Sequence, residues 1–258
     1  MKYIIHLEDE AAIASGRVGQ KFAVLAKAYR HGFPVPPAFA ISTEAHHFFL
    51  QNGHWPEGLS DEVYGAAEVL GLEKGLSIRS SATREDLENH SFAGQYRTFL
   101  EVCRPAELKE KIQQCWLSAE ADHVRSYLES MSESNGAETP LMGIILQRMV
   151  RAQVSGVAFG CNPMRPDSRN VVIEAVRGLA DKLVNGHTTP YRGVVSENGL
   201  LTLDTFPRNP HVSEKADQPL LKKTEWLEIA DTARRLEKLN GRTPQDIEWA
   251  IDSDQHLW

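Results

Sequence analysis

Short apolar stretches with the character of buried strands alternate along this chain with stretches that repeat apolar residues at helical spacing. Gly143–Leu146 and Val171–Ala175 are apolar runs of strand length, whereas Thr224–Leu239 is amphipathic with the helical period. The alternation is loose, and the sequence has no internal repeat. The presence of both strand-like and helix-like stretches predicts an α+β or mixed α/β protein. With 258 residues, the chain is long enough to form two lobes.

The remaining elements follow from similar patterns and from the residues that interrupt them. The proline-rich turn at 32–37 must end the helix before it, because proline lacks a donor and restricts the residue before it. Thr43 is a candidate N-cap for the next helix. We expect strands at 3–5, 77–79, 98–102, 143–146, 154–159, 171–175 and 246–251, helices at 21–30, 44–51, 106–128 and 224–239, and polar connections at 80–95, 130–140 and 207–219.

Composition and charge exclude several classes of protein. The chain has 28 Lys plus Arg against 35 Asp plus Glu, and the resulting net charge of -7 argues against a generic nucleic-acid binder or a basic membrane-surface protein. No apolar run approaches the roughly 18 residues that a membrane helix needs, and the acidic N-terminus offers no signal core. Three cysteines without a Cys-x-x-Cys pair indicate neither a disulfide framework nor a zinc site, so the cytoplasm is the expected compartment.

The stretch from Arg79 to Gln95 has the most distinctive chemistry in the sequence. It combines an arginine, several small hydroxyl residues and Gly94 between two expected strands. Small residues let backbone N–H groups approach phosphate oxygens, and hydroxyl and guanidinium groups add donors. On the residues alone, a phosphate-binding loop and an ordinary solvated strand connection both remain open.

Lys21 opens the first expected helix, directly after Gly19 and Gln20. A cation in the first helical turn opposes the helix dipole, which favours anions at that end. A bound phosphate would reconcile the two, because it accepts hydrogen bonds from both the helix N–H groups and the ammonium. The alternative for a single lysine is a surface residue paired with a nearby acid.

Three acidic residues are candidates for a magnesium site. Glu248 alternates with apolar neighbours on an expected strand, Glu174 follows another apolar run, and Asp181 lies shortly after it. Mg²⁺ takes one or two carboxylates together with phosphate oxygens. The alternative for each residue is a solvated acid on an edge strand or at a helix start. The histidines form no metal-binding pattern.

Taken together, five stretches resemble the N-terminal nucleotide-binding domain shared by phosphoenolpyruvate synthase, pyruvate phosphate dikinase and rifampicin phosphotransferase. They occur in the order of that family and span nearly the whole chain. The stretches are Val18–Lys21 with Leu25, the turn Gly32–Pro37, Arg79–Leu87 with Ser91–Gln95, Gln147–Val150 followed by Ser155–Phe159 and Asn162-Pro163, and Asp246–Ala250.

The resemblance implies an ATP-grasp-like α+β fold in which ATP lies in a cleft between two lobes. It implies a first lobe at 1–145 with the phosphate loop 79–95, and a second lobe at 146–258 with the adenine hinge 147–150 and the metal strand 246–251. Lys21 and Arg79 would hold phosphates and act as the catalytic cations, and Thr83 with the loop Ser91, Gly94 and Gln95 would close over them. Gln147, Met149 and Val150 would receive the adenine, Glu174 and Asp181 would lie near the ribose or metal, and Glu248 would bind Mg²⁺.

The sequence departs from the family pattern at several positions. Val18 stands where a second glycine is usual, Ala180-Asp181 replaces Gly-Glu, and His123 aligns with a common arginine. Family members continue beyond the Asp-Ile-Glu-Trp strand into a Gln-x-Arg strand, whereas this sequence ends at Trp258. The shorter Asp181 and the missing motif both bear on metal and phosphate binding.

The resemblance implies a Mg-ATP-binding phosphotransferase module that passes phosphate from ATP to a carrier histidine on another domain or chain. Lys21, Arg79 and Glu248 favour this hypothesis. A second hypothesis is a non-catalytic nucleotide-binding regulatory or scaffold protein, which the altered acidic motif and the missing Gln-x-Arg favour. A third, a freestanding small-molecule kinase, lacks a recognisable acceptor site. Neither a nucleic-acid nor a membrane partner is expected.

Overall fold

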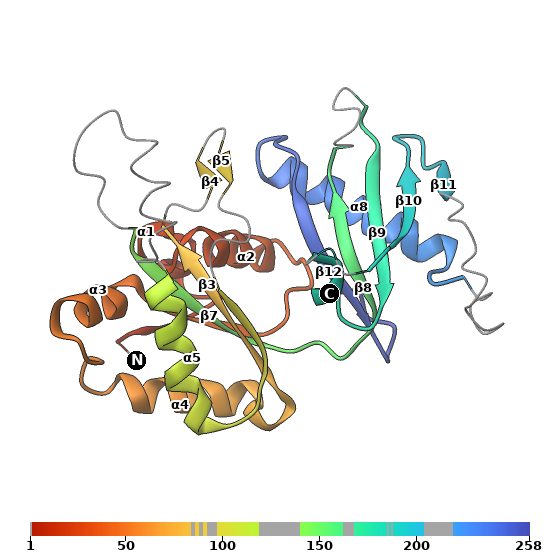
Figure 1. Ribbon diagram of the computed structural model, residues 1–258. Helices are drawn as coiled ribbons and strands as arrows, with labels where there is room; N and C mark the ends of the chain where they lie inside the picture. The colour runs from red at the N-terminus through yellow and green to blue at the C-terminus, as the bar shows by residue number, and fades with distance from the viewer. Residues whose placement is uncertain are drawn as a thin grey trace. The chain divides into compact units, whose positions relative to one another are not determined.

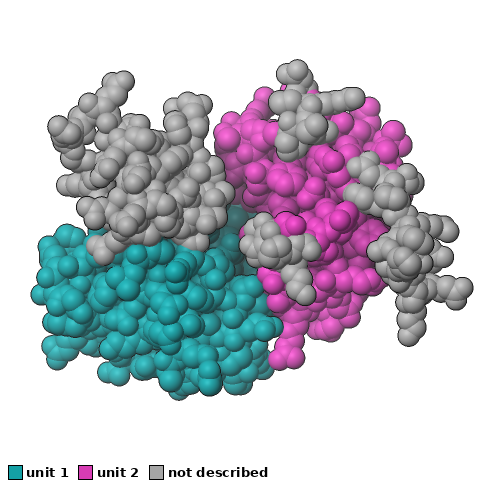
Figure 2. Space-filling model, viewed as in Figure 1, with its two compact units in different colours: residues 1–149 teal, residues 150–258 magenta. Residues whose placement is uncertain are grey.

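The chain divides into two compact units, residues 1–149 and 150–258 (Figure 2). The computed structural model describes residues 2–83, 86–87, 90–91, 97–118, 140–161, 168–184, 186, 188–203 and 219–258. Each unit contains an antiparallel five-stranded sheet with helices packed on it, which confirms the predicted α+β class. The first lobe is expected to end at residue 145, and the first compact unit extends to Met149 because a strand of its sheet runs to Arg148.

The first unit is built on a sheet with the strand order β1-β2-β7-β3-β6 (Figure 1). A small antiparallel pair of strands, β4 and β5, follows β3. The strands are β1 (Ile4–His6), β2 (Ala38–Ile41), β3 (Leu76–Ala82), β4 (Asp86–Leu87), β5 (His90–Ser91), β6 (Thr98–Val102) and β7 (Met142–Arg148). The helices are η1 (Glu10–Ile13), α1 (Ser15–Val18), α2 (Gln20–Arg30), α3 (Thr43–Asn52), α4 (Leu59–Leu70), η2 (Leu72–Lys74) and α5 (Pro105–Ser118).

Helices cover both faces of this sheet, because its side chains alternate between two apolar clusters. Phe22 and Ala26 of α2 pack with Ala40 and Ile145 on one face. The other face, which includes Ile78, packs against α3, α4 and α5. Every second residue of β3 therefore points toward the side of the sheet that carries α2.

The second unit has the strand order β11-β10-β9-β8-β12 and one long helix. The strands are β8 (Ala152–Phe159), β9 (Val171–Arg177), β10 (Tyr191–Val195), β11 (Leu201–Leu203) and β12 (Asp246–Asp252), and the helices are α7 (Asp181–Val184) and α8 (Lys223–Leu239). Helix α8 covers one face, where Trp226 and Ile229 pack with Ile173 and Trp249 (Figure 1). The acidic residues of β9 and β12 discussed below point to the opposite face.

Most of the expected elements are present, with two corrections. The N-cap of α3 is Ser42, not Thr43, because the Thr43 hydroxyl donates to the Gly16 carbonyl at 2.7 Å instead. The polar residues Ser80 and Ser81, expected in a loop, lie within the buried strand β3. The expected helix 106–128 is present as far as Ser118, and the rest of it lies outside the described residues. In the described part of the chain, no helix is long and apolar enough to span a bilayer.

Candidate functional site

The first turn of α2 is attached to the end of β3 by the side chain of Ser81. The residue that precedes the helix is Gly19, which has no side chain to cap it. The Phe22 N–H, the third of the helix, donates instead to the Ser81 hydroxyl at 3.1 Å. This is the donor that a serine at an N-cap would ordinarily satisfy. The cap therefore comes from a strand 59 residues away, and it places Lys21 beside the strand that carries Arg79.

Arg79 lies on the same face of the sheet as α2. It pairs with Ile145 on β7 and with Thr98 on β6, and Ile145 packs against α2. Since directly opposed residues of an antiparallel pair share a face, the α2 face also carries Ser81, two residues further along β3. The structure thus brings the two predicted phosphate-binding cations, Lys21 and Arg79, to one face of the first unit.

The charge of Lys21 also acts on the interior of the first unit. Burial raises the pKa of the Cys115 thiol to about 12, and the nearby charges of Arg97 and Lys21 act in the opposite direction. The Cys115 thiol donates to the Arg97 carbonyl at 3.5 Å, and the Ser80 hydroxyl donates to the same oxygen at 3.2 Å. Lys21 therefore lies within electrostatic range of the region where β3 and β6 pair.

The predicted lid over the phosphates is described only in part. Thr83 follows β3 directly, is half-buried, and donates its N–H to the Leu141 carbonyl at 2.9 Å. Ser91 belongs to β5, although its side chain is not described. Gly94 and Gln95 lie outside the described residues. Thr83 is therefore the one residue of the predicted lid whose anchoring the described part of the chain shows, and it is held at the end of β3.

The predicted adenine hinge begins inside β7. Gln147 is buried, pairs with Ser77 and Ala38, and donates from Nε2 to the Pro36 carbonyl at 3.3 Å. The Met149 N–H donates to the Gly75 carbonyl at 3.2 Å. Among the described residues, the Met149 carbonyl and the Arg151 N–H form no hydrogen bond with another backbone group. The hinge therefore offers one acceptor and one donor two residues apart, on either side of Val150.

Val18, which stands where the family usually has a second glycine, lies in the core of the first unit. Its side chain is fully buried with Phe22 and Ala26 of α2. The backbone here is also closely packed, because a Cβ on Gly143 would lie 2.5 Å from the Val18 carbonyl oxygen. Valine at this position therefore packs inward, into the apolar cluster beneath α2.

In the second unit, strand register places Glu248 and Glu174 on one face. Both residues pair with Val157 of β8, Glu248 from β12 and Glu174 from β9. They therefore lie in one row across the sheet, roughly 10 Å apart at the backbone given the spacing of adjacent strands. Arg192 of β10 continues this row, opposite Glu174. Glu248 is exposed and Glu174 and Arg192 are half-buried. Two carboxylates and one guanidinium thus share the face opposite α8.

Asp181, the third predicted acid, does not belong to this row. It is the first residue of the four-residue helix α7 and is exposed. The preceding Gly178 is held on β8, because its N–H donates to the Gln153 carbonyl at 2.8 Å and its carbonyl accepts from the Ser155 hydroxyl at 2.5 Å. Asp181 therefore follows a well-anchored turn but lies off the sheet that presents the other two acids.

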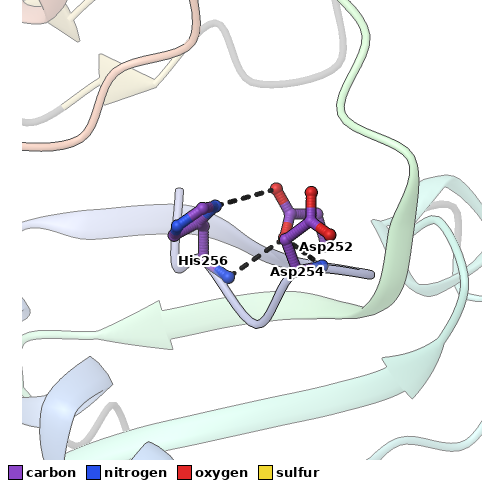
Figure 3. A group of neighbouring side chains, drawn as sticks. All are labelled: Asp252, Asp254 and His256. Atoms are coloured by element: carbon purple, nitrogen blue, oxygen red, sulfur yellow. Dashed lines mark hydrogen bonds and ion pairs between the residues drawn. The ribbon is translucent and has the colours of Figure 1, made fainter.

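Asp252, Asp254 and His256 form a second cluster of potential metal ligands at the turn after β12 (Figure 3). Asp252 accepts the N–H groups of Asp254 and His256 at 2.9 and 3.0 Å, and the indole N–H of Trp258 at 2.8 Å. The Trp258 hydrogen bond is the largest influence that lowers the pKa of Asp252. These contacts close the turn that returns the chain onto β12, so a structural role accounts for the cluster.

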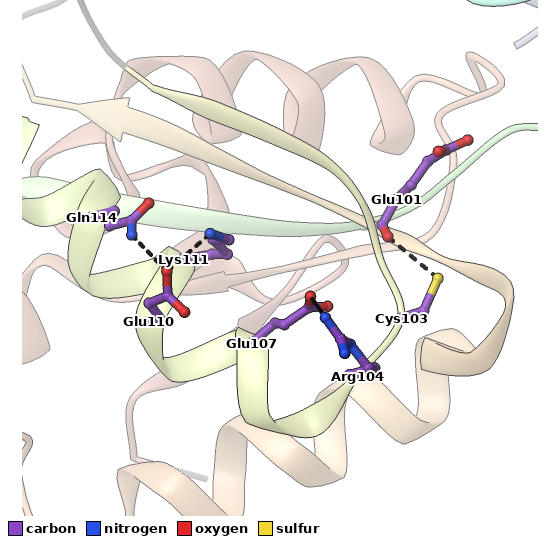
Figure 4. Close-up of polar contacts among 7 residues, drawn as sticks. All are labelled: Glu101, Cys103, Arg104, Glu107, Glu110, Lys111 and Gln114. Atoms are coloured by element: carbon purple, nitrogen blue, oxygen red, sulfur yellow. Dashed lines mark hydrogen bonds and ion pairs between the residues drawn. The ribbon is translucent and has the colours of Figure 1, made fainter.

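Charged residues of α5 and of the segment between β6 and α5 form separate surface contacts (Figure 4). Arg104 pairs with Glu107, and Lys111 pairs with Glu110 at 3.0 Å. The thiol of Cys103 donates to the Glu101 carbonyl at 3.3 Å, at a bulge where Glu101 has a φ of 56°. Exposed ion pairs of this kind add little to stability, because water screens the charges and ordering two long side chains costs conformational entropy. We therefore regard these contacts as part of a solvated surface.

The comparisons with known proteins identify the family. Residues 50–258 match the family model described as pyruvate phosphate dikinase, AMP/ATP-binding domain. This match covers most of the chain, and the chain therefore belongs to this family. Membership supports the ATP-grasp-like interpretation of the sequence. Lys21 precedes the matched range, but relatives that align over nearly the whole chain include its position.

Three curated relatives illustrate the range of this family. An uncharacterized phosphotransferase YvkC of Bacillus subtilis is 30% identical over 95% of this chain and 33% of its own length. The phosphoenolpyruvate synthase of Aeropyrum pernix is 30% identical over 97% of this chain and 40% of its own. A rifampicin phosphotransferase of a Streptomyces species is 30% identical over 77% of this chain and 24% of its own length. The chain spans about a quarter to two fifths of the length of these relatives.

Proposed function

We propose that this chain is the Mg-ATP-binding module of a dikinase-type phosphotransferase, which donates phosphate from ATP to a carrier histidine on another domain or chain. The observation that supports it most is the match to the AMP/ATP-binding family, in a chain whose first unit gathers Lys21 and Arg79 on one face. Phosphoryl transfer depends mainly on positioned cations and donors that stabilise charge, with little covalent work by the protein. Lys21 and Arg79 are cations of the kind that this chemistry uses.

Each group of site residues has a proposed role in this module. Lys21 and Arg79 bind phosphate oxygens, and Thr83, Ser91, Gly94 and Gln95 close over them. The Met149 carbonyl and the Arg151 N–H bind the adenine edge, because adenine presents a donor and an acceptor side by side. This assignment narrows the predicted hinge to backbone groups on either side of Val150, with Gln147 holding β7 in place.

Glu248 and Glu174 would hold Mg²⁺, and their chemistry fits the ion. Mg²⁺ prefers oxygen ligands and takes one or two carboxylates with phosphate oxygens and water. When bound, the ion neutralises charge on the phosphates. Glu248 is exposed on the sheet face that also carries Glu174, so the two carboxylates share one side of the second sheet. Asp181 has a peripheral role near the ribose in this proposal, because it lies outside their row.

The phosphate acceptor is proposed to be a histidine supplied by a carrier domain. The test is to mix the chain with a separately purified carrier domain of a phosphoenolpyruvate synthase and ATP labelled in its β- and γ-phosphates. We expect Mg-dependent, acid-labile label on the carrier, and none on a carrier whose histidine is replaced by alanine. ATP binding without any label on the carrier would contradict transfer.

A non-catalytic nucleotide-binding role is the second candidate. The specific observation in its favour is Asp181, which replaces the family's glutamate and is exposed at the start of α7. Under this alternative, ATP binding persists but no phosphate reaches the carrier histidine. The same labelling experiment therefore separates the two functions.

The three free cysteines are compatible with action in the cytoplasm, where we expect either role.

A further inference from the structure

The buried hydroxyl of Ser81 acts on the part of α2 that carries Lys21. Ser81 is fully buried within β3 and accepts the Phe22 N–H at 3.1 Å. Phe22 follows Lys21 directly, so this hydrogen bond fixes the backbone of the helical turn from which the ammonium extends. A serine engaged in this way is a helix cap supplied from another element of the fold.

Gly19 brings the helix and the strand into direct backbone contact. A Cβ on Gly19 would lie 1.8 Å from the Ser81 carbonyl oxygen and 2.4 Å from its hydroxyl oxygen. Gly19 also has a φ of 78°, a conformation that favours glycine. The close approach and the cap together hold the start of α2 against Ser81 at two points.

Arg79 lies two residues before Ser81 on the same face of β3, about 7 Å away along the strand. We propose that Ser81 is a positioning residue for nucleotide phosphates, which holds Lys21 of α2 and Arg79 of β3 at a set separation. This inference rests on the proposed function, because it assumes that both cations bind ATP. It also assigns the Ser81 hydroxyl to the protein's own backbone and not to the ligand.

The other serines of β3 do not connect the strand to α2. The Ser77 hydroxyl donates to the Gln147 carbonyl at 3.5 Å, and the Ser80 hydroxyl donates to the Arg97 carbonyl. Ser77 shares the strand, the face and the burial of Ser81. Ser77→Ala is therefore a matched control that removes a buried hydroxyl without releasing the helix.

The test compares binding of ATP and of adenosine, which lacks phosphates, to the full chain and its variants. We expect Ser81→Ala to weaken ATP binding about five- to tenfold, as the loss of a helix cap predicts, and to leave adenosine binding unchanged. Ser81→Cys, whose slightly larger thiol fills the site but is a poor acceptor, should behave similarly and decides the question if Ser81→Ala does not fold. Ser77→Ala should bind both ligands like the wild type.

A double-mutant cycle with Lys21→Ala completes the test. If Ser81 acts through Lys21, Ser81→Ala adds little to the loss of ATP affinity already caused by Lys21→Ala. Wild-type ATP affinity in both Ser81 variants, equal losses for ATP and adenosine, or full additivity with Lys21→Ala would overturn the inference. Failure of the wild-type chain to bind ATP is a different result, which rejects the proposed function itself.

Discussion

At the level of single residues, the proposed ATP site depends on cations and carboxylates in particular places. Lys21 and Arg79 reach one face of the first sheet because Ser81 joins their two elements. Glu174 and Glu248 share a row of the second sheet because both pair with Val157. Each of these placements can be tested by changing one side chain.

Lys21→Ala and Arg79→Ala should each weaken ATP binding by about 1.5–3 kcal/mol, the range for hydrogen bonds to charged groups. Lys27→Ala is the matched control, because Lys27 lies in the last turn of the same helix. Isothermal titration calorimetry measures all three variants. If both site variants keep the wild-type affinity, the phosphates bind elsewhere.

Glu248→Gln should remove most of the effect of Mg²⁺ on ATP affinity, because it deletes one charge from the proposed metal site. Glu228→Gln is the control, since Glu228 is exposed on α8, which packs against the opposite face of the sheet. The quantity to compare is the ratio of ATP affinities with and without Mg²⁺. An unchanged ratio in Glu248→Gln would argue against metal binding there.

His46 predicts a dependence of stability on pH. Burial lowers its pKa to about 4, and its Nδ1 accepts the Met142 N–H at 2.9 Å. Between pH 4 and 6.5 the unfolded chain binds more protons at this residue, so the free energy of unfolding falls as the pH is lowered. The decrease from pH 7 to 5 should be about 2 kcal/mol.

Urea denaturation at the two pH values measures this decrease. His46→Gln should reduce the pH dependence, whereas His47→Gln, at the neighbouring position, should retain it. The comparison uses the difference between pH values and not absolute stability, because His46→Gln also alters a buried contact. An equal decrease in His46→Gln and the wild type would show that other groups cause it.

At the scale of elements, close backbone approaches determine how strands and helices pack. A Cβ on Gly156 of β8 would lie 2.9 Å from the Trp249 ring and 1.8 Å from the Glu174 carbonyl oxygen. Gly156→Ala should therefore destabilise the second unit by about 1–3 kcal/mol through overpacking. Gly65→Ala in α4 meets open space and should instead stabilise the chain by about 0.5–1 kcal/mol.

Thermal unfolding of both glycine variants tests this contrast. The account expects a lower midpoint for Gly156→Ala and a slightly higher one for Gly65→Ala. An unchanged unfolding midpoint for Gly156→Ala would mean that β8, β9 and β12 can move apart without loss of stability. In that case the row of Glu174 and Glu248 is not rigidly held.

The elements also show which parts of the fold can be predicted from local patterns. Helix α8 and strand β12 follow from periodicity, and α4 has apolar residues at helical spacing between Gly58 and Gly71 that could have identified it. The end of β3 could not be recognised locally. Ser80 and Ser81 resemble loop residues in sequence, and their partners Arg97 and Phe22 are far away along the chain.

The same reasoning applies to the site. Lys21, Arg79 and Glu248 can be proposed from the sequence because their neighbours resemble known motifs, and their roles stay predictions. The capping role of Ser81 and the position of Arg192 beside Glu174 depend on strand register. A single residue of register shift moves every side chain to the other face, so no local pattern reveals such neighbours.

At the scale of the whole molecule, the proposed function requires a phosphate acceptor on another domain or chain. The chain by itself should therefore show little ATP turnover. Measuring release of phosphate, ADP and AMP over hours checks this expectation. Rapid turnover by the pure protein would reveal an acceptor or an activated water that the proposal does not contain.

The most direct test of the central claim is a calorimetric titration of the full chain with ATP, in the presence and absence of Mg²⁺. The account predicts saturable binding at one site per chain, tighter with Mg²⁺ and weakened in Lys21→Ala and Arg79→Ala. The absence of heat, together with no thermal shift at millimolar ATP, would contradict it.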